Sequence, residues 1–274
     1  MRIVYTLAIV FLCHFNFVTS KKCFKTICIP SGYDRLINPP TKNATTEVLV
    51  RFINIQIIDI DENRSRITLK LTIVMNWVEP RIFTSANASE EDKKPLIKSF
   101  MILPKDFVNL LWLPDAYIPD VHDIKKYKFV HEFEEFYYNL ENRIASKVEV
   151  EIVLLCKMKF EDFPMDENAC FFALGSYSPL EQSAQHFSLL REFKNRLLDP
   201  IVFNISTQAT QLDFTVDVKE ALPRDVDKTR EGIYYFQRSG FKIIFKRKIS
   251  GYITSYYFPS GILVVLSWVS CFSS

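Results

Sequence analysis

The 274-residue chain has few residues of several kinds, and each scarcity argues against a class of protein. Only 6 residues are glycine, too few to favour a fold that holds nucleotides with glycine-rich loops. The 4 histidines show no catalytic or zinc-ligand spacing, and the sequence has no GxSxG, HExxH, P-loop or paired CxxC motif. The net charge is +2, without the basic stripe that nucleic acid attracts. We therefore expect no enzyme, no cofactor, no structural metal site and no nucleic-acid partner.

The chain is instead rich in apolar and aromatic residues with a two-residue period. Hydrophobic residues make up 48% and aromatic residues 14%, a composition that suits a packed core with β-structure. Apolar side chains alternate with polar ones in Arg66–Met75, Val148–Leu155 and Leu212–Val218. Polar turn segments separate such runs, and no helical stripe of similar length precedes the carboxyl end. The pattern predicts a mainly β fold, an antiparallel sandwich or barrel.

Both ends of the sequence are apolar. Residues 1–20 combine a basic second residue, an apolar run and small terminal residues, which is typical of a secretory signal peptide; a membrane anchor is the alternative. Residues 257–274 carry no charge and follow the cationic Phe245–Lys248, as at a membrane edge. Because a spanning helix needs about 20 apolar residues, we expect 251–274 to be the truncated beginning of a transmembrane helix; a buried core helix is the alternative. Residues 21–250 would then form one extracellular domain.

Cysteines and sequons also favour secretion. Outside the two apolar ends four cysteines remain, an even number that suits an oxidising compartment. We favour the pairs Cys23–Cys28 and Cys156–Cys170, while the other two pairings stay open. Four Asn-x-Ser/Thr sequons are present, at Asn43, Asn63, Asn87 and Asn204. The expected glycosylation sites are Asn43, Asn87 and Asn204.

The segment between the last two of these cysteines, CKMKFEDFPMDENAC, has a distinctive centre. A disulfide between Cys156 and Cys170 would stabilise the fold by about 3 kcal/mol in the chain-entropy model. Pro164 fixes φ and has no N–H, so the tip is predicted to be a rigid turn. A stiff apolar tip with Phe163 between charges suits contact with a neighbouring surface. An ordinary stapled surface hairpin is the alternative.

With its internal Phe-Pro-x-Asp, this loop resembles the one that characterises the Cys-loop receptors, the pentameric ligand-gated ion channels. WVEPR from Trp77, WLPD from Trp112 to Asp115, and Arg247 followed by GYITSYYFPSGILVVLSWVS match the family in the same order, over roughly residues 45–274. The last segment and FPMD look more like the anion-selective branch (GABA, glycine, glutamate or pH-gated) than the nicotinic one. The resemblance implies a β-sandwich of about ten strands with a short amino-terminal helix, and structural roles for Trp77, Trp112 and Asp115.

The resemblance also implies a mechanism. Homologous subunits would assemble as a homo- or hetero-pentamer at the plasma membrane, with a small-molecule agonist between ectodomains and lipid around the helix. The disulfide loop would touch the membrane domain, and a few residues would couple binding to gating: Glu62, Phe163, Pro164, Asp166 and Arg247. The alternative is that the charges are solvated surface groups, worth about 0–1 kcal/mol as pairs.

An aromatic box that binds the agonist is a further implication, with cation–π contacts of about 0.5–2 kcal/mol each. The matching positions are Tyr117, Tyr177, Tyr234, Tyr235 and Phe236, with Thr72 on the complementary face. The alternative is that these aromatic residues belong to the core.

Some positions depart from the family pattern. Thr72 and Pro179 stand where aromatic residues are usual, Val74 where an arginine or polar group meets a carboxylate, and Gly175 where an acidic residue is common. Without a bidentate Arg, amino-acid transmitters should bind poorly. The hypothesis is therefore that this subunit is not a conventional principal binder of an amino-acid transmitter. It would respond to another agonist, such as an amine, protons or zinc, or assemble with partner subunits that complete the site. Histidine and acidic side chains that would sense protons or zinc are found at His122, His186 and in His131–Phe136.

The family's pore-lining second membrane helix is absent from the sequence. The sequence is therefore expected to be either a fragment of a longer channel subunit or a truncated secreted or tethered protein that binds ligand or partner subunits without conducting.

Overall fold

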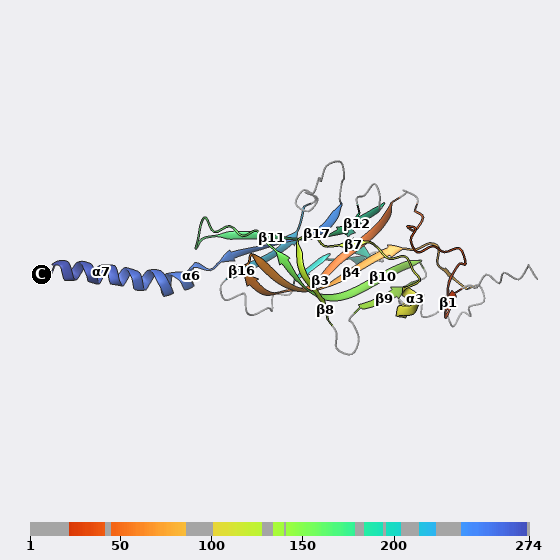
Figure 1. Ribbon diagram of the computed structural model, residues 1–274, viewed down its shortest axis with the longest axis horizontal. Helices are drawn as coiled ribbons and strands as arrows, with labels where there is room; N and C mark the ends of the chain where they lie inside the picture. The colour runs from red at the N-terminus through yellow and green to blue at the C-terminus, as the bar shows by residue number, and fades with distance from the viewer. Residues whose placement is uncertain are drawn as a thin grey trace, which may run out of the picture.

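The computed structural model describes residues 22–41, 45–85, 101–127, 134–139, 141–178, 184–193, 196–203, 214–222 and 237–272. Most of this part of the chain is β-strand, and one long helix leaves the strands along the long axis of the molecule (Figure 1). The strands form two facing sheets, as the alternating sequence predicts. The mainly β fold with a terminal apolar helix is confirmed.

The larger sheet has the strand order β12-β3-β4-β10-β9-β6, with β15 beside β3 and β8 beside β10. β12 and β15 run parallel to β3, whereas the other pairs are antiparallel. Parallel pairing arises because the chain reaches β12 from the other sheet by a crossover and not by a hairpin. The eight strands are β3 (Thr46–Asp61), β4 (Arg66–Val78), β6 (Met101–Leu103), β8 (Val121–Lys126), β9 (Glu134–Tyr138), β10 (Arg143–Leu155), β12 (Gln185–Leu189) and β15 (Ile201–Phe203).

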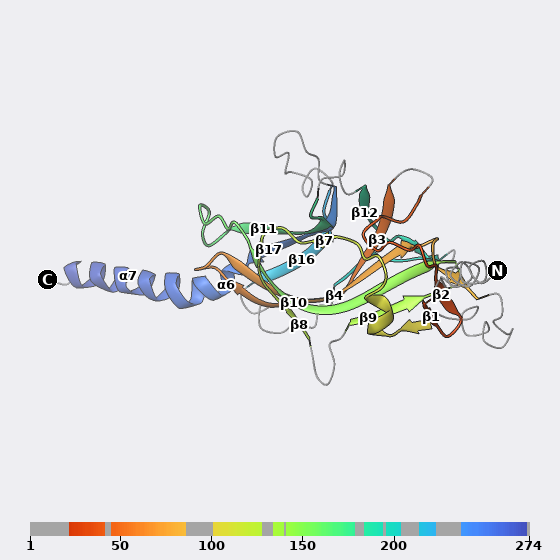
Figure 2. The same cartoon turned by 45° about the vertical axis from the view of Figure 1, so that its right-hand side comes forward.

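The second sheet has the order β16-β17-β11-β7 and is antiparallel throughout. Figure 2 shows it facing β3, β4 and β10 across the core. Its strands are β7 (Ala116–Tyr117), β11 (Glu167–Ser176), β16 (Phe214–Glu220) and β17 (Arg238–Arg247). Two small sheets complete the described strands: β1 (Lys22–Phe24) with β2 (Ile27–Ile29) and β5 (Phe83–Thr84), and β13 (Glu192–Phe193) with β14 (Arg196–Leu197).

The core lies between the two sheets, and its side chains follow the predicted alternation. In β4 the inward-facing residues are Ile67, Leu69, Leu71, Ile73 and Trp77, all buried, and the partly buried Met75, which confirms the two-residue period. Aromatic rings join the sheets at the centre. Phe172 of β11 stacks on Phe241 of β17 at 4.8 Å between centroids, and Phe52 of β3 meets both rings edge-on.

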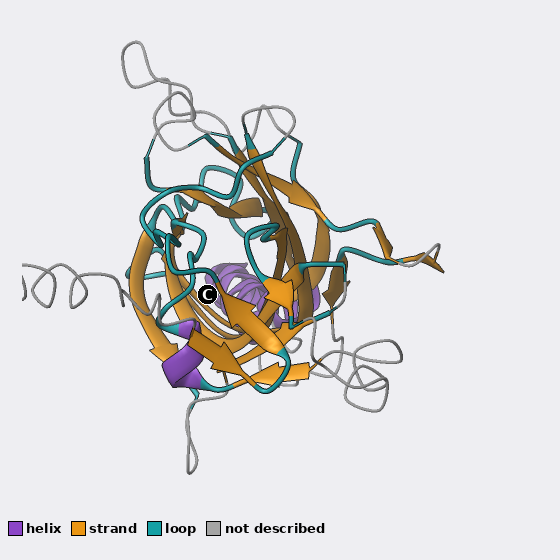
Figure 3. Cartoon of the chain, turned by 90° about the vertical axis from the view of Figure 1, so that its right-hand side faces the viewer, coloured by secondary structure: helices purple, strands orange, loops and turns teal. Residues whose placement is uncertain are grey.

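The terminal helix consists of α6 (Ile249–Tyr252), the π-helical turn η1 (Ile253–Tyr257) and α7 (Phe258–Phe272). Its 24 residues have a mean hydropathy of 1.3 and none is buried, so it is not a core helix. Within the described residues it is the one helix long and apolar enough to cross a membrane. Viewed along the long axis, it is seen end-on within the outline of the strands (Figure 3). Residues 22–41 contain no helix; the short helix of the described ectodomain is α3 (Lys105–Val108).

Candidate functional site

Arg247 is buried at the end of the sandwich because strand alternation places it on the inner face. Phe241 and Phe245 of β17 face the core, and Arg247 follows Phe245 in the same two-residue rhythm. Its backbone N–H donates to the carbonyl of Asp166, 3.3 Å away on the β11 side. Phe214 is its register partner in β16. Arg247 therefore lies between an acidic and an aromatic residue in one row across the sheet.

Two carboxylates and a phenol oxygen surround the Arg247 guanidinium. Nε donates to Asp166 Oδ1 at 2.7 Å and Nη2 donates to Oδ2 at 3.2 Å, a bidentate pair. Nη2 also donates to Glu62, and Nη1 donates to the Tyr252 hydroxyl at 2.8 Å. The Arg247 and Asp166 side chains are 2% and 3% exposed, whereas Glu62 is 31% exposed. We call Arg247, Asp166 and Glu62 the charge cluster.

Aromatic rings cover the guanidinium of the charge cluster. Its Cζ lies 4.9 Å from the ring centroids of Phe163 and Phe214 and 5.4 Å from that of Tyr252. Phe163 belongs to the disulfide loop and meets Tyr252 of α6 edge-on at 5.2 Å. The alternative of solvated surface charges therefore does not hold for Arg247 and Asp166. The loop and the helix share one cation between their rings.

Burial and pairing act in opposite directions on Arg247. Burial by itself lowers the pKa of the guanidinium, whereas hydrogen bonds with Asp166, Glu62 and Tyr252 and the nearby charge of Glu62 raise it. The net effect is a pKa above the ordinary arginine value. The cation is thus held charged at physiological pH, so a change in its partners, and not its titration, would alter the cluster.

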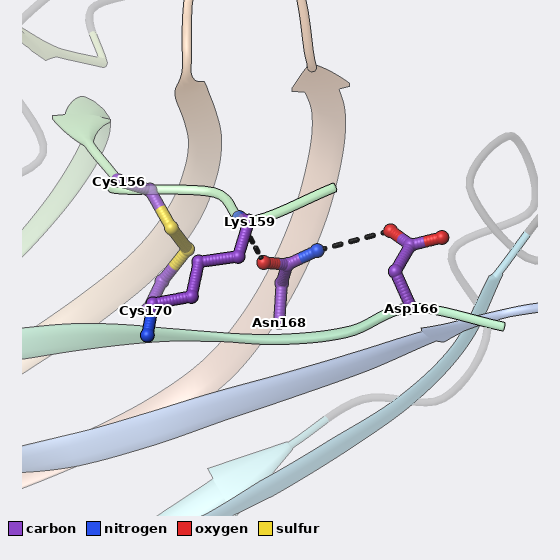
Figure 4. Close-up of a disulfide and its surroundings, with 5 residues drawn as sticks. All are labelled: Cys156, Lys159, Asp166, Asn168 and Cys170. Carbon is purple, nitrogen blue, oxygen red and sulfur yellow. Dashed lines mark hydrogen bonds between the residues drawn. A yellow bond between two sulfur atoms is a disulfide. The ribbon is translucent and has the colours of Figure 1, made fainter. Parts of the chain in front are cut away.

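The disulfide loop is tied to the sheet by more than its cysteines (Figure 4). The structure contains the Cys156–Cys170 disulfide, and Asn168 lies inside the loop with both ends of its amide bonded. Its Oδ1 accepts the Lys159 backbone N–H at 2.6 Å, and its Nδ2 donates to Asp166 Oδ2 at 3.1 Å. Asn168, which sequence reasoning missed, therefore connects the loop to the carboxylate that holds Arg247.

The tip of the loop leaves apolar side chains exposed beside the helix. Phe163 and Met165 are exposed, whereas Pro164 is buried and its peptide bond with Phe163 is cis. Figure 1 shows the loop before β11 at the end of the sandwich from which α6 leaves. The loop is also attached to the β3–β4 turn, where the Ser65 carbonyl accepts the Cys156 backbone N–H at 2.8 Å. Glu62 belongs to the same turn.

The predicted aromatic box is represented by one tyrosine pair at the opposite end of β11. The rings of Tyr117 and Tyr177 meet edge-on with centroids 5.3 Å apart, and both are exposed. Asp115 holds the Tyr177 side of the pair: its carbonyl accepts the Tyr177 N–H at 3.2 Å, and its Oδ2 accepts the Ser176 hydroxyl at 3.4 Å. Tyr234, Tyr235 and Phe236 lie outside the described residues.

Thr72 does not join the tyrosine pair. It lies on β4 in the other sheet, with Glu149 and Ile53 as its register partners, and is only 3% exposed. A buried threonine offers little surface to a ligand on a neighbouring subunit. The structure therefore argues against direct ligand contact by Thr72, because the sheet covers the position that the family match selected.

The unusual Gly175 has a packing explanation. Gly175 lies between Tyr117 of β7 and Arg238 of β17 in one cross-strand row. A Cβ at Gly175 would lie 2.6 Å from Arg238 Cγ and 2.7 Å from the Gln237 carbonyl oxygen. The Arg238 stem thus occupies the space that a larger residue would need. The row places an arginine next to the tyrosine pair, a feature that the sequence did not indicate.

The two tryptophan motifs meet around Tyr33. Trp77 and Trp112 are buried with their rings edge-on at 6.3 Å. The Tyr33 hydroxyl accepts the Trp112 backbone N–H at 2.7 Å and donates to Glu79 Oε2 at 2.9 Å, while both Glu79 oxygens bind Arg81. Burial is the main cause that raises the pKa of the Tyr33 hydroxyl. This network fastens the amino-terminal segment to the WVEPR and WLPD turns.

The histidines form no metal centre in the part of the chain that the structure describes, where no three His, Cys, Asp or Glu side chains converge. His122 is exposed on β8, and His186 lies with its Nε2 3.4 Å from Gln237 Nε2. His131 lies outside the described residues, as do Asn43, Asn87, Asn204 and residues 1–20. Asn63 is exposed in the β3–β4 turn beside Glu62.

Residues 24–249 match the family described as the neurotransmitter-gated ion-channel ligand-binding domain. The chain is 20% identical over 254 residues to pH-sensitive chloride channel 2 of Drosophila melanogaster, covering 88% of this chain and 45% of the relative. It is 24% identical over 252 residues to gamma-aminobutyric acid receptor subunit pi of Rattus norvegicus, covering 88% and 50%. A third relative, gamma-aminobutyric acid receptor subunit beta of Caenorhabditis elegans, is 22% identical over 227 residues, covering 81% and 36%. The chain spans about half the length of these curated relatives or less.

Proposed function

The chain belongs to the Cys-loop receptor family of neurotransmitter-gated ion-channel ligand-binding domains, and from this premise we propose that it forms the extracellular part and first membrane helix of a pentameric channel subunit. Agonist binding between subunits would be passed to the membrane through the charge cluster. The observation that carries this proposal is the position of Arg247, which joins the disulfide loop, the β3–β4 turn and the helix. Chloride selectivity is proposed from relatives named as a chloride channel and as GABA receptor subunits.

A continuous strand pair supports transmission between the two ends of the ectodomain. β11 and β17 pair in register from Glu167 with Lys246 to Gly175 with Arg238. At about 3.4 Å per residue, this ladder is roughly 30 Å long. The tyrosine pair follows its Gly175 end, and Asp166 and Arg247 lie at its other end. A tilt of the ladder on agonist binding would therefore move the pair that holds the loop on the helix.

The cluster suits a switch because its contacts come from elements that can move separately. Asp166 belongs to the sheet end, Glu62 to a turn, and Tyr252 to the helix. Glu62 and Tyr252 each make one hydrogen bond with the guanidinium, whereas Asp166 makes two. A small rotation could exchange the single contacts while the bidentate pair persists, which gives two discrete arrangements.

The agonist is proposed to bind at the tyrosine pair, which presents exposed aromatic surface with a fixed backbone. An ammonium over these rings would gain about 0.5–2 kcal/mol per cation–π contact. Arg238, in the same cross-strand row as Tyr117, could instead meet an acidic group, so an amine, an amino acid and protons all belong in the agonist screen. Residues 1–20 are proposed as the signal peptide, 21–250 as the extracellular domain and 251–274 as the start of the membrane region. The mature subunit is proposed to reach the plasma membrane.

The test uses a chimera, because the curated relatives extend beyond this chain. The chain is fused at Phe272 to the remaining membrane region of the GABA receptor pi subunit and expressed in oocytes. Amino acids, amines, acidic pH and zinc are applied while current is recorded. Tyr177→Ala should abolish the response, whereas Tyr177→Phe should retain most of it because the ring remains. Agonist responses that are unchanged in Tyr177→Ala would refute the tyrosine-pair assignment.

A charge exchange tests the coupling role in the same chimera. Asp166→Arg and Arg247→Asp should each impair gating, and the double exchange should recover part of it, with surface biotinylation correcting for expression. Losses that simply add in the double variant would contradict the pairing. Glu62→Gln provides a milder variant that keeps shape; it should shift the agonist concentration for half-maximal current without reducing surface expression.

A further inference from the structure

A cavity of about 390 Å³ lies inside the sandwich, between the inner face of the larger sheet and the 113–118 segment. Its floor consists of alternate residues of β4 and β10, such as Ile73, Met75 and Val148, and its other wall includes Leu113 and Leu174. The volume falls within the range of about 300–1,000 Å³ that is usual for small-molecule sites. The lining is mostly apolar, as such sites require.

Two hydrogen-bonding side chains line this cavity and have no hydrogen-bond partner among the described residues. Trp77 is 1% exposed and Ser146 is 2% exposed. Within the described part of the chain, neither Trp77 Nε1 nor Ser146 Oγ has a hydrogen-bond partner, although the neighbouring Trp112 Nε1 donates to Asn38 Oδ1 at 3.1 Å. A buried polar group without a partner is unfavourable by about 1–3 kcal/mol. Both groups can donate, so together they favour an acceptor atom placed between apolar walls.

The charged residues of the lining do not favour a charged ligand. Lys126 and Glu134 are the two ionised side chains among the lining residues, and Lys126 Nζ donates to Glu134 Oε2 at 2.9 Å. They neutralise each other from two strands that both pair with β10. An ion placed beside the remaining apolar walls would lose its hydration without a partner.

We propose that this cavity binds a small neutral amphiphile, an aromatic or aliphatic molecule with one oxygen acceptor. The oxygen accepts hydrogen bonds from Trp77 Nε1 and Ser146 Oγ, and the apolar body packs on the aliphatic floor. At the roughly 30 Å³ that a water molecule occupies in the liquid, the cavity holds about 13 non-hydrogen atoms, and somewhat more when they are bonded to one another. The lining comes from one chain, whereas an agonist between subunits would contact two.

Tyr117 connects this cavity to the tyrosine pair. It lines the cavity and also forms the edge-on contact with Tyr177. A molecule in the cavity that shifts Tyr117 would alter the tyrosine pair, and an agonist on the pair would change affinity in the cavity by the same factor. This link rests on the proposed function, whereas binding in the cavity does not.

The test is photolabelling of the full chain in detergent micelles, followed by peptide mass spectrometry. The probe is benzyl alcohol bearing a trifluoromethyl-diazirine, which has a hydroxyl oxygen and a size close to the cavity limit. Label is expected on cavity residues such as Met75, Leu113 and Val148, and excess unlabelled benzyl alcohol derivative should compete with it. Because no current is measured, failure here is distinct from failure of the proposed channel.

Matched variants decide the outcome. Ser146→Ala should weaken half-maximal labelling about twofold to tenfold, the loss expected for one hydrogen bond, whereas Ser188→Ala on β12, outside the cavity lining, should leave it unchanged. Val148→Phe should abolish cavity labelling while circular dichroism shows a folded sheet. Labelling confined to the exposed α7, or equal in Ser146→Ala and the unsubstituted chain, would overturn the proposal. So would a cavity that takes up only water, seen as no saturable label at millimolar probe.

Discussion

Replacement of Asp166 by Asn tests whether the charge cluster stabilises the fold. The Arg247 and Asp166 side chains are 2% and 3% exposed and share two hydrogen bonds. Removing one partner of a buried pair is destabilising by about 3–5 kcal/mol, because the remaining charge stays buried. Glu62 still contacts the guanidinium, so the lower end, about 3 kcal/mol, is expected. In a domain of this size, about 2–4 °C per kcal/mol corresponds to a fall in Tm of about 6–12 °C.

The assay is thermal unfolding of the full chain in detergent, followed by circular dichroism at low and high salt. Glu62→Gln should lower Tm by only about 2–4 °C, since solvent screens a carboxylate that is 31% exposed. Asp217→Asn is the control, because Asp217 pairs with Lys219 at 2.7 Å on an exposed face. Its Tm should not change. The shift for Asp166→Asn should be nearly independent of salt.

The result that would refute this reasoning is equality of the buried and exposed variants. If Asp166→Asn lowered Tm no more than Asp217→Asn, the guanidinium of Arg247 would be hydrated after the substitution. The cluster would then be a surface feature without a role in joining the loop to the helix.

Three further outcomes are expected. Serine at both Cys156 and Cys170 should lower the free energy of unfolding by about 3 kcal/mol, measured by urea unfolding against the unsubstituted chain; no loss would mean that the loop is not constrained. Gly240→Ala should disrupt the β11–β17 ladder, seen as faster amide exchange in β17, because a Cβ there would lie 2.8 Å from the Phe172 carbonyl carbon; unchanged exchange would contradict the close approach. Burial raises the pKa of Tyr138 to about 12. The free energy of unfolding should therefore be unaffected by this phenol below pH 10 and fall by about 3 kcal/mol as the pH rises from 10 to 12, where the unfolded chain ionises first. In urea unfolding, Tyr138→Phe should reduce that fall with pH.

Much of the fold was predictable because its signals are local. The alternation in Arg66–Met75 follows directly from strand geometry, and the uncharged terminal segment predicts a membrane helix by length and composition. The residues of the charge cluster could be named only through the resemblance to a family. A lone arginine before an apolar segment, a glutamate in a turn and an aspartate after a proline carry no mutual signal in the sequence.

The site residues that sequence reasoning missed have partners only two to nine residues away, but their contacts depend on how the loop and the first turn of the helix fold. Asn168 joins Lys159 to Asp166, and Tyr252 meets Arg247 only because the helix leaves the sheet directly below the loop. Tyr252 could have been suspected as an aromatic residue one turn beyond the arginine. The reverse error concerns Thr72, whose family position suggested a ligand contact although its sheet buries it.

By itself, the sequence determined the strands, the bracketed loop and the apolar segment, since each depends on the periodicity or composition of neighbouring residues. Only the tertiary structure decided that Arg247 is buried between Asp166 and Phe214, that Arg238 occupies the space beside Gly175, and that Trp77 and Ser146 share a cavity. These arrangements depend on strand register and on the facing of two sheets, which long-range packing fixes and no local pattern encodes.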